Sequence, residues 1–274
     1  MILVILIPIL LGILYLASFK PRGIRSEEVW KQFEKVEIAH RGFFNNKEEY
    51  PENSLPAFQR AVDAGFGIEL DVQMSKDGKL VVFHDGTLKR MCKDERMLID
   101  LTYDELQQFY LKRSSQKIPL FEDVLKVIDG KVPLIVEIKY EGDSIKTVEK
   151  TVEMMKDYPG LYVMESFDPK VVHWLRKNRP DIIRGQLAED YMEKEDMNWF
   201  TKRILTNFML NWWTKPDFCA YDFHCREFAI FKQMCKFYHF KKVCWTIKDA
   251  VQLEEAHKVF DVCIFDSFDP REEI

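Results

Sequence analysis

The chain has 274 residues, of which 47% are hydrophobic and 31% charged, and its formal net charge is −5 at pH 7. This apolar content is enough for a folded core, which excludes disorder and collagen-like repeats, and the many charges exclude a polytopic membrane protein. The negative net charge offers no basic field for nucleic acid, so no nucleic-acid partner is expected. The six cysteines form no CxxC pair, which argues against a zinc–cysteine site, and nothing implies a protein partner.

The N-terminal segment is the most apolar part of the chain. Residues 1–19 carry no charged side chain, and Lys20, Arg22 and Arg25 follow. A helix of this length is about 28 Å long, close to the thickness of the hydrocarbon layer. We therefore expect a single-pass transmembrane helix over 1–19 and a basic juxtamembrane linker over 20–34. The basic residues after the helix predict that the rest of the chain lies on the cytoplasmic side. A cleaved signal peptide is the alternative, but its basic region would precede the apolar run.

The rest of the chain alternates between strand-like and helix-like segments. Helices are expected at Ser54–Ala64, which begins with a Ser and a Pro, and at Thr102–Phe109, where Thr102 and Glu105 form a capping-box pattern. Strands separated by helices predict a parallel sheet covered by helices. The expected strands are Val36–Ala39, Gly67–Gln73, Leu80–His84, Leu134–Lys139, Leu161–Phe167, Ile182–Leu187, Phe218–Phe223, Val243–Ile247 and Val262–Asp266.

The second and third of these strands are too close in the sequence to be parallel. Only residues 74–79 separate them, whereas a parallel crossover needs a dozen or more residues. Asp77-Gly78 is typical of a two-residue hairpin turn, which would place Asp71 opposite His84. Eight parallel strands then remain, which predicts that residues 35–274 form a (β/α)8 TIM barrel. A doubly wound sheet is the alternative, but its Gly-rich first turn is missing.

Charged residues interrupt two of the predicted apolar strands. Glu69 and Asp71 lie two positions apart in one strand, and Glu137 and Lys139 do so in another, so each pair projects from one face. An ionised side chain in such a strand is costly unless it is paired or bound to a metal. Barrel enzymes carry their chemistry where the strands end. The sequence therefore predicts a cluster of three carboxylates flanked by two histidines: Glu69, Asp71, Glu137, His40 and His84.

These residue types indicate metal-assisted hydrolysis of a phosphate ester. Three carboxylates suit a hard divalent cation, Mg²⁺ or Ca²⁺, better than zinc. Two histidines, His40 and His84, suit a general base and a general acid. Arg41 and Lys139 supply positive charge for an anionic group such as a phosphate. A structural salt bridge is the usual interpretation of one carboxylate pair in a strand, but the convergence of several such groups favours a functional site.

Several short motifs occur in the order and spacing of a known family. They are Ile38-Ala39-His40-Arg41-Gly42, Pro51-Glu52-Asn53-Ser54, Glu69-Leu70-Asp71-Val72, Val82-Phe83-His84-Asp85, Glu137-Ile138-Lys139, Ser166-Phe167, Trp245-Thr246 and the terminal Asp266. Over about residues 36–270, the chain resembles the glycerophosphodiester phosphodiesterase family.

This resemblance implies a barrel of the phosphatidylinositol-phospholipase-C type, a PLC-like phosphodiesterase. It implies hydrolysis of glycerophosphodiesters to glycerol 3-phosphate and an alcohol with one divalent cation, Mg²⁺ or Ca²⁺. Which histidine is the base, and whether a cyclic phosphate forms, stay open. The residues implied are the acid–base pair His40 and His84, the metal ligands Glu69, Asp71 and Glu137, and the substrate-binding residues Arg41, Glu52, Lys139 and Trp245.

The chain departs from the family pattern at two places. The loop between Gly42 and Pro51 carries a polar insert at residues 47–49. The last strand ends in Phe265-Asp266-Ser267, where the family usually has Thr-Asp, so Asp266 is not assigned a substrate role.

Residues 199–213 (WFTKRILTNFMLNWW) combine aromatic, aliphatic and basic side chains. One interpretation is a barrel helix that buries Ile204, Phe208 and Leu210, which the helical spacing favours. The other is contact with a membrane interface, which requires Trp212 and Trp213 to be partly exposed.

Two substrate classes fit the predicted chemistry. The first comprises small water-soluble glycerophosphodiesters such as glycerophosphocholine, which need a polar pocket. The second comprises membrane lysophospholipids, on which the protein would act as a lysophospholipase D, and these need an apolar groove. A barrel that binds a phosphodiester without cleaving it would lack a histidine or a metal carboxylate, and none of these is missing.

Overall fold

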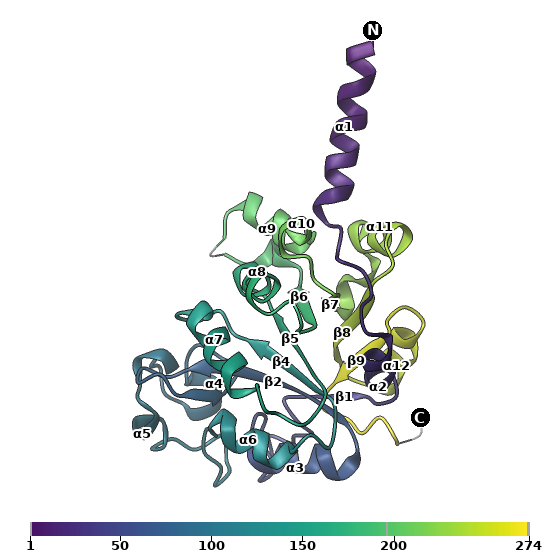
Figure 1. The fold of residues 1–274 in the computed structure, drawn as a ribbon. Coiled ribbons are helices and arrows are strands. Elements are labelled where there is room, and N and C mark those ends of the chain that lie inside the picture. The colour runs from purple at the N-terminus through teal and green to yellow at the C-terminus, as the bar shows by residue number, and fades with distance from the viewer. Residues whose placement is uncertain (1, 196, 273–274) are drawn as a thin grey trace.

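The computed structural model describes residues 2–195 and 197–272, and its main body is a closed barrel (Figure 1). Eight parallel strands follow the order β1-β9-β8-β7-β6-β5-β4-β2, and β1 pairs with β2 to close the ring. A ninth strand, β3, pairs antiparallel with β2 on the outside of this ring. The predicted (β/α)8 TIM barrel is therefore confirmed. The strands are β1 (Ile38–His40), β2 (Gly67–Met74), β3 (Leu80–Val82), β4 (Leu134–Ile138), β5 (Tyr162–Ser166), β6 (Arg184–Ala188), β7 (Phe218–Asp222), β8 (Lys241–Ile247) and β9 (Val262–Phe265).

Helices follow most of the strands and cover the outside of the barrel. Two predicted starts are found as expected: Ser54 caps α3, where its Oγ accepts from the Ala57 N–H, and Thr102 and Glu105 form a capping box at α5. The helices are α1 (Ile2–Ser18), α2 (Glu27–Phe33), α3 (Leu55–Ala64), α4 (Lys89–Cys92), α5 (Tyr103–Leu106), α6 (Phe121–Ile128), α7 (Ser144–Met154), α8 (Pro169–Asn178), α9 (Trp199–Thr206), α10 (Asn211–Thr214), α11 (Ala229–Phe237) and α12 (Ala250–His257), with short 3-10 turns at Leu98–Asp100, Tyr191–Glu193 and Phe223–Glu227.

The hairpin between β2 and β3 exists, but its predicted register is wrong by one residue. The N–H of Ser75 donates to the carbonyl of Lys79 across a loop of three residues, and Gly78 in this loop has a φ of 78°. A three-residue loop with a left-handed Gly is a common hairpin alternative to the two-residue turn. The extra residue places Asp71 opposite Phe83, whose N–H donates to the Asp71 carbonyl at 3.0 Å. His84 therefore follows the strand instead of pairing with Asp71.

The predicted transmembrane helix over 1–19 is not confirmed. The chain forms α1 there, but this helix has 17 residues and ends at Ser18. Among the residues that the structure describes, no helix is long and apolar enough to cross a membrane. The cytoplasmic placement of the domain depended on a spanning helix and stays a prediction.

The residues expected to form a linker, 20–34, contain a helix that belongs to the barrel. Trp30 and Phe33 lie on one side of α2 and are completely buried. They pack with the inward-facing side chains Ile38, Ile135 and Phe218, and the Trp30 and Phe218 rings meet edge to face at 5.2 Å. This helix within the predicted juxtamembrane linker therefore contributes two side chains to the barrel core.

Candidate functional site

Three acidic side chains meet inside the barrel because their strands are neighbours in register. His40 on β1 lies beside Glu69 on β2, and Asp71 on β2 lies beside Glu137 on β4. Carboxylate oxygens of Glu69, Asp71 and Glu137 all lie within 4.8 Å of one another, and all three side chains are buried. The structure thus brings together the three carboxylates that the sequence predicted as a cluster.

His40 is held by a carboxylate from the last strand. Its Nδ1 lies 3.0 Å from Asp266 Oδ2, so Nδ1 carries a proton and donates to the carboxylate. Its other ring nitrogen, Nε2, lies 3.8 Å from Glu69 Oε2. Burial lowers the pKa of His40 to about 4, assisted by the positive charge of Arg41 and opposed by Asp266. Asp266 is itself bound by Lys248 Nζ at 2.6 Å, which fixes its position.

His84 is held in the same way by its chain neighbour. Its Nδ1 lies 2.6 Å from Asp85 Oδ1. Arg90 Nε donates to the other Asp85 oxygen at 2.7 Å, so this carboxylate is fixed on both sides. In both histidines the Nδ1 position is occupied by a carboxylate, which leaves Nε2 as the ring nitrogen that can exchange a proton with a ligand.

Two cations, the buried Lys139 and the largely buried Arg41, lie against the carboxylate cluster. Lys139 Nζ is 2.8 Å from Glu137 Oε1 and 3.4 Å from Asp71 Oδ1. Burial disfavours its charged form, but these two carboxylates outweigh burial and raise the pKa of Lys139, so the ammonium stays charged. Arg41 Nε lies 3.4 Å from Asp71 Oδ2, and Arg41 Nη1 donates to Glu52 Oε1 at 2.7 Å. The site therefore presents a guanidinium and an ammonium beside two histidines.

The backbone after β1 turns sharply to make this arrangement. Arg41 and Gly42 have φ values of 56° and 83°, both in the left-handed region. The turn directs the Arg41 N–H to Glu69 Oε2 at 3.1 Å. A Cβ at Gly42 would lie 3.0 Å from the backbone of Ala57 in α3. A side chain at position 42 is therefore disfavoured both by conformation and by space.

Glu52 joins the loop after β1 to the segment after β3. Its two oxygens accept from Arg90 Nη1 at 2.6 Å and Arg90 Nη2 at 2.7 Å, a bidentate pair, in addition to Arg41. Burial raises the pKa of this carboxyl, but the hydrogen bonds and positive charges of Arg90 and Arg41 prevail and lower it to about 2. Glu52 therefore holds both guanidiniums in place.

We expect this ion cluster to make stability fall in acid. A carboxyl whose pKa is lowered on folding stabilises the protein fully above its unfolded pKa of about 4.3, and this contribution is lost as the pH falls to about 2. The lost contribution is at most about 3 kcal/mol for Glu52. Urea unfolding of the Glu52→Gln protein should show a smaller loss between pH 4 and 2 than the unchanged chain. The exposed Glu48→Gln variant is the control, and an equal pH slope in both variants would contradict the assignment.

A fourth buried carboxylate, which the sequence analysis missed, completes the interior. Glu165 on β5 lies beside Glu137 on β4 in register, is 1% exposed, and its Oε2 accepts no hydrogen bond from the described residues. Burial and repulsion by Glu137 and Asp71 raise its pKa well above the usual range. Its signal was present in the sequence, because Glu165 also interrupts an apolar strand.

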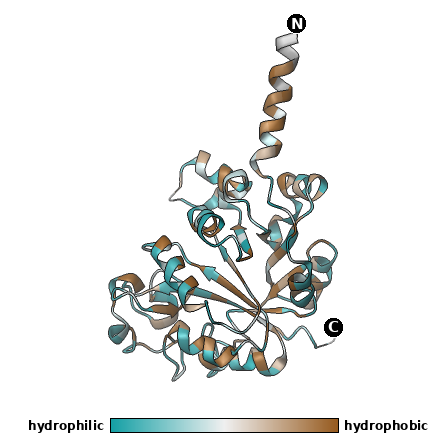
Figure 2. Cartoon of the chain, viewed as in Figure 1, coloured by the Kyte–Doolittle hydropathy of each residue, from teal (hydrophilic) through white to brown (hydrophobic). Residues whose placement is uncertain are grey.

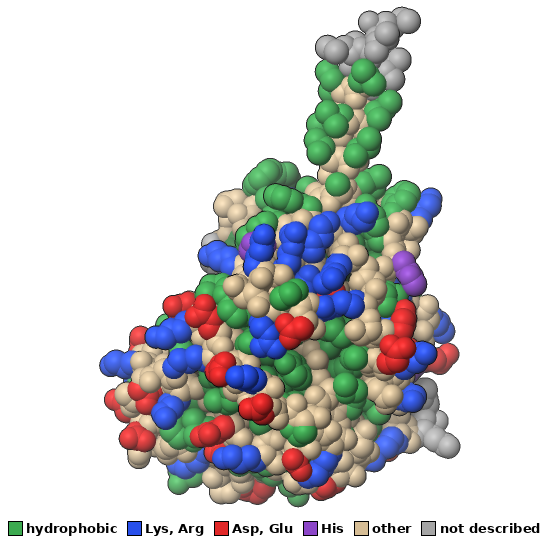
Figure 3. All heavy atoms as spheres, in the orientation of Figure 1, with side chains coloured by type: hydrophobic (Ala, Val, Ile, Leu, Met, Phe, Trp, Pro, Cys, Tyr) green, Lys and Arg blue, Asp and Glu red, His purple; other side chains and the backbone are tan. Residues whose placement is uncertain are grey.

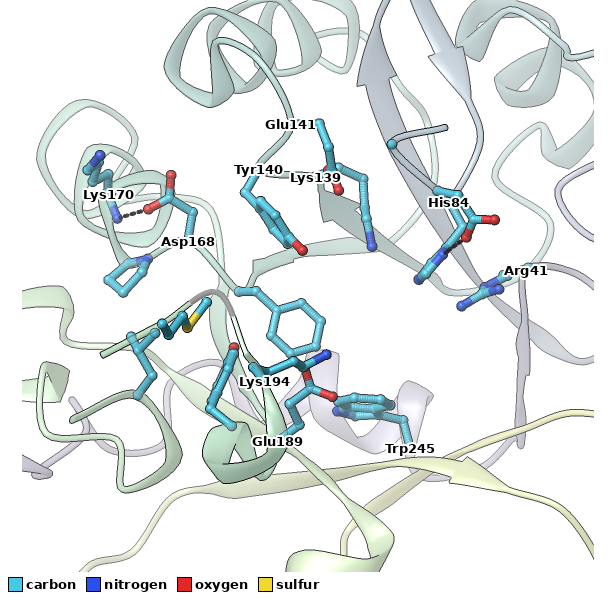
Figure 4. A pocket seen from close by; sticks show the side chains of 17 residues that line it. Arg41, His84, Lys139, Tyr140, Glu141, Asp168, Lys170, Glu189, Lys194 and Trp245 are labelled. Atoms are coloured by element: carbon cyan, nitrogen blue, oxygen red, sulfur yellow. Dashed lines mark hydrogen bonds and ion pairs between the residues drawn. The ribbon is translucent and has the colours of Figure 1, made fainter. Parts of the chain in front are cut away.

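A cavity of about 730 Å³ opens over these groups. Figure 4 shows Arg41, His84 and Lys139 at one end of it, with Trp245 below and Lys170 at the opposite end. Phe167 also lines the cavity, and its ring meets the Trp245 ring edge to face at 5.5 Å. A small cavity underneath is lined by both histidines and by three of the carboxylates: His40, His84, Glu69, Glu137 and Glu165.

The carboxylate cluster fits a divalent cation by its donor set. Its three carboxylates supply only oxygen ligands, as Mg²⁺ and Ca²⁺ prefer. Asp71 Oδ1 is buried and accepts no hydrogen bond from the residues described. Burial, together with repulsion by Asp71 and Glu137, raises the pKa of Glu69 well above its usual range, and a bound cation would relieve this repulsion.

Seven of the nine predicted site residues line these two cavities, and the other two, Asp71 and Glu52, contact the cavity residue Arg41. The residues that sequence reasoning missed are those that position them. Asp85 and Arg90 fix His84, and Asn53 Nδ2 donates to Asp71 Oδ2 at 2.8 Å. Asp85 and Asn53 lie inside recognised motifs, but Arg90 carried no signal of its own.

Comparison with known proteins gives a consistent result. Residues 40–265 match the model of the glycerophosphoryl diester phosphodiesterase family. A glycerophosphodiester phosphodiesterase of Bacillus altitudinis is 33% identical over 58% of this chain and 69% of its own length. A glycerophosphodiester phosphodiesterase of Caldanaerobacter subterraneus subsp. tengcongensis is 35% identical over 56% of this chain and 66% of its own length. This chain therefore spans about two thirds of the length of these two relatives. The human glycerophosphodiester phosphodiesterase 1 is 30% identical over 61% of this chain and 53% of its length.

Solved structures share the fold. A phosphodiesterase of Oleispira antarctica in complex with the product sn-glycerol-3-phosphate superposes with a TM-score of 0.66 and 22% identity, over 84% of this chain and 92% of that chain. A glycerophosphodiester phosphodiesterase of Thermotoga maritima superposes with a TM-score of 0.63 and 23% identity, over 84% of this chain and 94% of that chain.

Proposed function

Because the chain belongs to the glycerophosphoryl diester phosphodiesterase family, we propose that this phosphodiesterase cleaves glycerophosphodiesters into glycerol 3-phosphate and an alcohol by paired-histidine catalysis with a divalent cation, Mg²⁺ or Ca²⁺. The observation that carries the proposal is the matched pair of histidines. His40 and His84 are each fixed at Nδ1 by a carboxylate, Asp266 and Asp85, and both line the cavity beside the carboxylate cluster.

Each side chain has a role that follows from its position. The Nε2 atom of one histidine accepts the proton of the attacking hydroxyl, which belongs to water or to the glycerol moiety, and Nε2 of the other donates a proton to the leaving alcohol oxygen. If the glycerol hydroxyl attacks, water then opens the cyclic phosphate to give glycerol 3-phosphate. Arg41 and Lys139 bind the phosphate oxygens. Bound at Glu69, Asp71 and Glu137, a divalent cation would polarise the phosphoryl group and stabilise the negative charge that develops on it. Glu52 holds Arg41 in place, and Trp245 forms a wall for the glycerol moiety.

The identity of the products tests the bond that is cleaved. We expect the full chain, incubated with glycerophosphocholine and either Mg²⁺ or Ca²⁺, to release glycerol 3-phosphate and choline in equal amounts. Release of glycerol and phosphocholine would mean that the other phosphoester bond is cleaved. If no glycerophosphodiester gave either pair of products, the proposal would be contradicted.

Asp266 acts through His40, and we expect its replacement to reduce turnover rather than binding. Asp266→Asn removes the carboxylate that accepts from His40 Nδ1, so the ring loses its fixed orientation. We predict that kcat falls at least about tenfold while KM changes little, as for other residues that orient a site histidine. Steady-state kinetics with glycerophosphocholine measures both constants.

Two further variants separate positioning from general damage to the fold. Asp269→Asn alters a nearby carboxylate that pairs with Arg271 at 2.5 Å, and we expect unchanged kinetics. Asp266→Glu keeps the acceptor and should recover part of the lost kcat. If Asp266→Asn raised KM as strongly as it lowered kcat, Asp266 would contact the substrate instead.

A specific feature of the cavity favours the second substrate class, lysophospholipids. The cavity is lined by the apolar residues Pro169, Met197 and Leu205 in addition to charged residues such as Asp168 and Lys170. The apolar part of this lining suits part of an acyl chain. We propose lysophospholipase D activity as the second candidate. The proposal is supported if the unchanged chain hydrolyses lysophosphatidylcholine and Leu205→Asp suppresses this activity but preserves turnover of glycerophosphocholine. Equal effects of Leu205→Asp on both substrates would count against lysophospholipase D activity.

A further inference from the structure

The helix α1 leaves the barrel and exposes apolar side chains on all sides. In Figure 1 it stands away from the domain, and in Figure 2 it is hydrophobic along its length. Leu10, Leu11, Leu14 and Tyr15 are 44–60% exposed, as are other apolar residues of this helix. An apolar surface of this extent on a charged domain is typical of an interaction site.

The base of α1 is attached to the barrel by specific contacts. Tyr238 Oη donates to the Leu16 carbonyl at 2.8 Å, and Asn211 Nδ2 donates to the Phe19 carbonyl at 3.1 Å. The buried Phe19 ring packs edge to face against Tyr15 and Tyr238. These contacts fix the helix between α10 and the end of α11, so side chains of these elements surround its base.

Exposed aromatic side chains lie on the elements around this base. Trp212 on α10 is 54% exposed, Phe237 at the end of α11 is 52% exposed, and Trp199 and Phe200 on α9 are 62% and 66% exposed. Trp213 is partly exposed as well, so the condition set for an interfacial role of residues 199–213 is met. Figure 3 shows hydrophobic side chains on both sides of the base of the helix.

A cluster of basic side chains lies at the same end. Lys20 is exposed, Lys215 and Arg176 are half-buried, and no described carboxylate lies within ion-pair distance of these three. Burial lowers the pKa of Lys215, and repulsion from Lys20 and Arg176 lowers it further, so the three charges lie near one another. Arg22 and Arg25 share one buried carboxylate, Asp217. Figure 3 shows basic side chains gathered on the surface below α1.

The order of side chains along the axis of α1 identifies the partner. An aliphatic helix is followed by exposed aromatic side chains on α9, α10 and α11 and by a cluster of cations, which matches the hydrocarbon, interfacial and headgroup layers of a bilayer. We propose that this docking face, made of α1, the exposed aromatic residues of α9, α10 and α11, and the cations Lys20, Arg176 and Lys215, binds the surface of an anionic lipid bilayer.

The docking face is connected to the cavity through one helix. Leu205 in α9 lines the cavity, and Trp199 and Phe200 at the start of the same helix belong to the docking face. Binding to lipid therefore places one wall of the cavity at the membrane. The inference goes beyond the proposed reaction and does not depend on it, because lipid binding is measured without turnover.

Vesicle sedimentation of the full chain tests the docking face. We expect a higher partition coefficient on vesicles of phosphatidylcholine mixed with phosphatidylglycerol than on phosphatidylcholine alone, and a decrease with added salt. Lys20→Glu/Lys215→Glu should lower binding to the anionic vesicles about tenfold or more, since each cation near an anionic surface contributes to binding. Trp212→Ser/Phe237→Ser should lower binding to both kinds of vesicle.

The matched control is Lys126→Glu/Lys131→Glu, which reverses two exposed lysines at and just after α6, on the other side of the barrel. This variant should bind like the unchanged chain, and equal melting temperatures confirm that all variants are folded. The proposal is overturned if both vesicle types bind equally at low salt, or if the docking-face variants bind like this control.

Discussion

Replacing His84 with alanine is expected to lower kcat for glycerophosphodiester hydrolysis by about 10²–10⁴-fold, the usual contribution of a general acid or base. His84 is fixed at Nδ1 by Asp85 and lines the cavity, and His40, the other histidine of the site, is assigned the opposite proton transfer. The side chain is partly exposed and outside the apolar core, so its loss should not unfold the protein. Stopped assays of glycerol 3-phosphate release measure the effect.

His224→Ala is the matched control for this prediction. His224 is exposed and lies after β7, outside both cavities. The control should keep full activity. A His84→Ala protein that retained more than about a tenth of the original kcat would exclude His84 as an acid or base.

Glu69→Gln is expected to abolish the metal response without weakening the fold. Three buried carboxylates repel one another, so replacing one of them with a neutral group of the same shape relieves repulsion in the absence of metal. The melting temperature without metal should therefore stay the same or rise. Without one of its three charged ligands the site should no longer bind Mg²⁺ or Ca²⁺ tightly, and metal-dependent activity should fall at least about 100-fold.

Melting curves with and without added metal separate the two parts of this prediction. In the unchanged chain, Mg²⁺ or Ca²⁺ should raise the melting temperature, because a ligand that binds only the folded state stabilises it. In Glu69→Gln this rise should disappear, whereas Asp123→Asn, at a half-buried residue of α6 that pairs with Lys126, should keep it. A metal-induced rise of equal size in Glu69→Gln would show that the cation binds elsewhere.

The barrel could be predicted because its strands obey simple spacing rules. Alternation of apolar runs with helices gave the parallel sheet, and the short gap of 74–79 required a hairpin. The register of that hairpin could not be predicted, because a loop of two residues and one of three both place Gly78 near the turn. The choice depends on the packing of β3 against its neighbours, which a local pattern does not contain.

The carboxylate cluster could be predicted because side chains alternate along a strand and parallel strands end at the same edge. This reasoning placed Glu69, Asp71 and Glu137 together. It could not supply Arg90, which reaches Glu52 from 38 positions away through the folding of the segment after β3. Glu165 was missed although it carried the same signal as Glu69, a charge in an apolar strand.

The N-terminal residues show where an apolar pattern is insufficient. The pattern detected a helix, but its end at Ser18 depends on how Phe19 packs against Tyr238. The charged residues after it indicated a linker, whereas Trp30 and Phe33 fill the barrel core. Their spacing of three positions is typical of one helical face and was the available signal.

The most direct test of the proposed mechanism is release of glycerol 3-phosphate from glycerophosphocholine by the full chain, measured after treatment with EDTA and again after Mg²⁺ or Ca²⁺ is added back. We expect activity to disappear with EDTA, to return with at least one of the two metals, and to stay absent in the His40→Ala protein under both conditions. Full activity in EDTA, or restored activity in His40→Ala, would contradict a site built from two histidines and a carboxylate-bound cation.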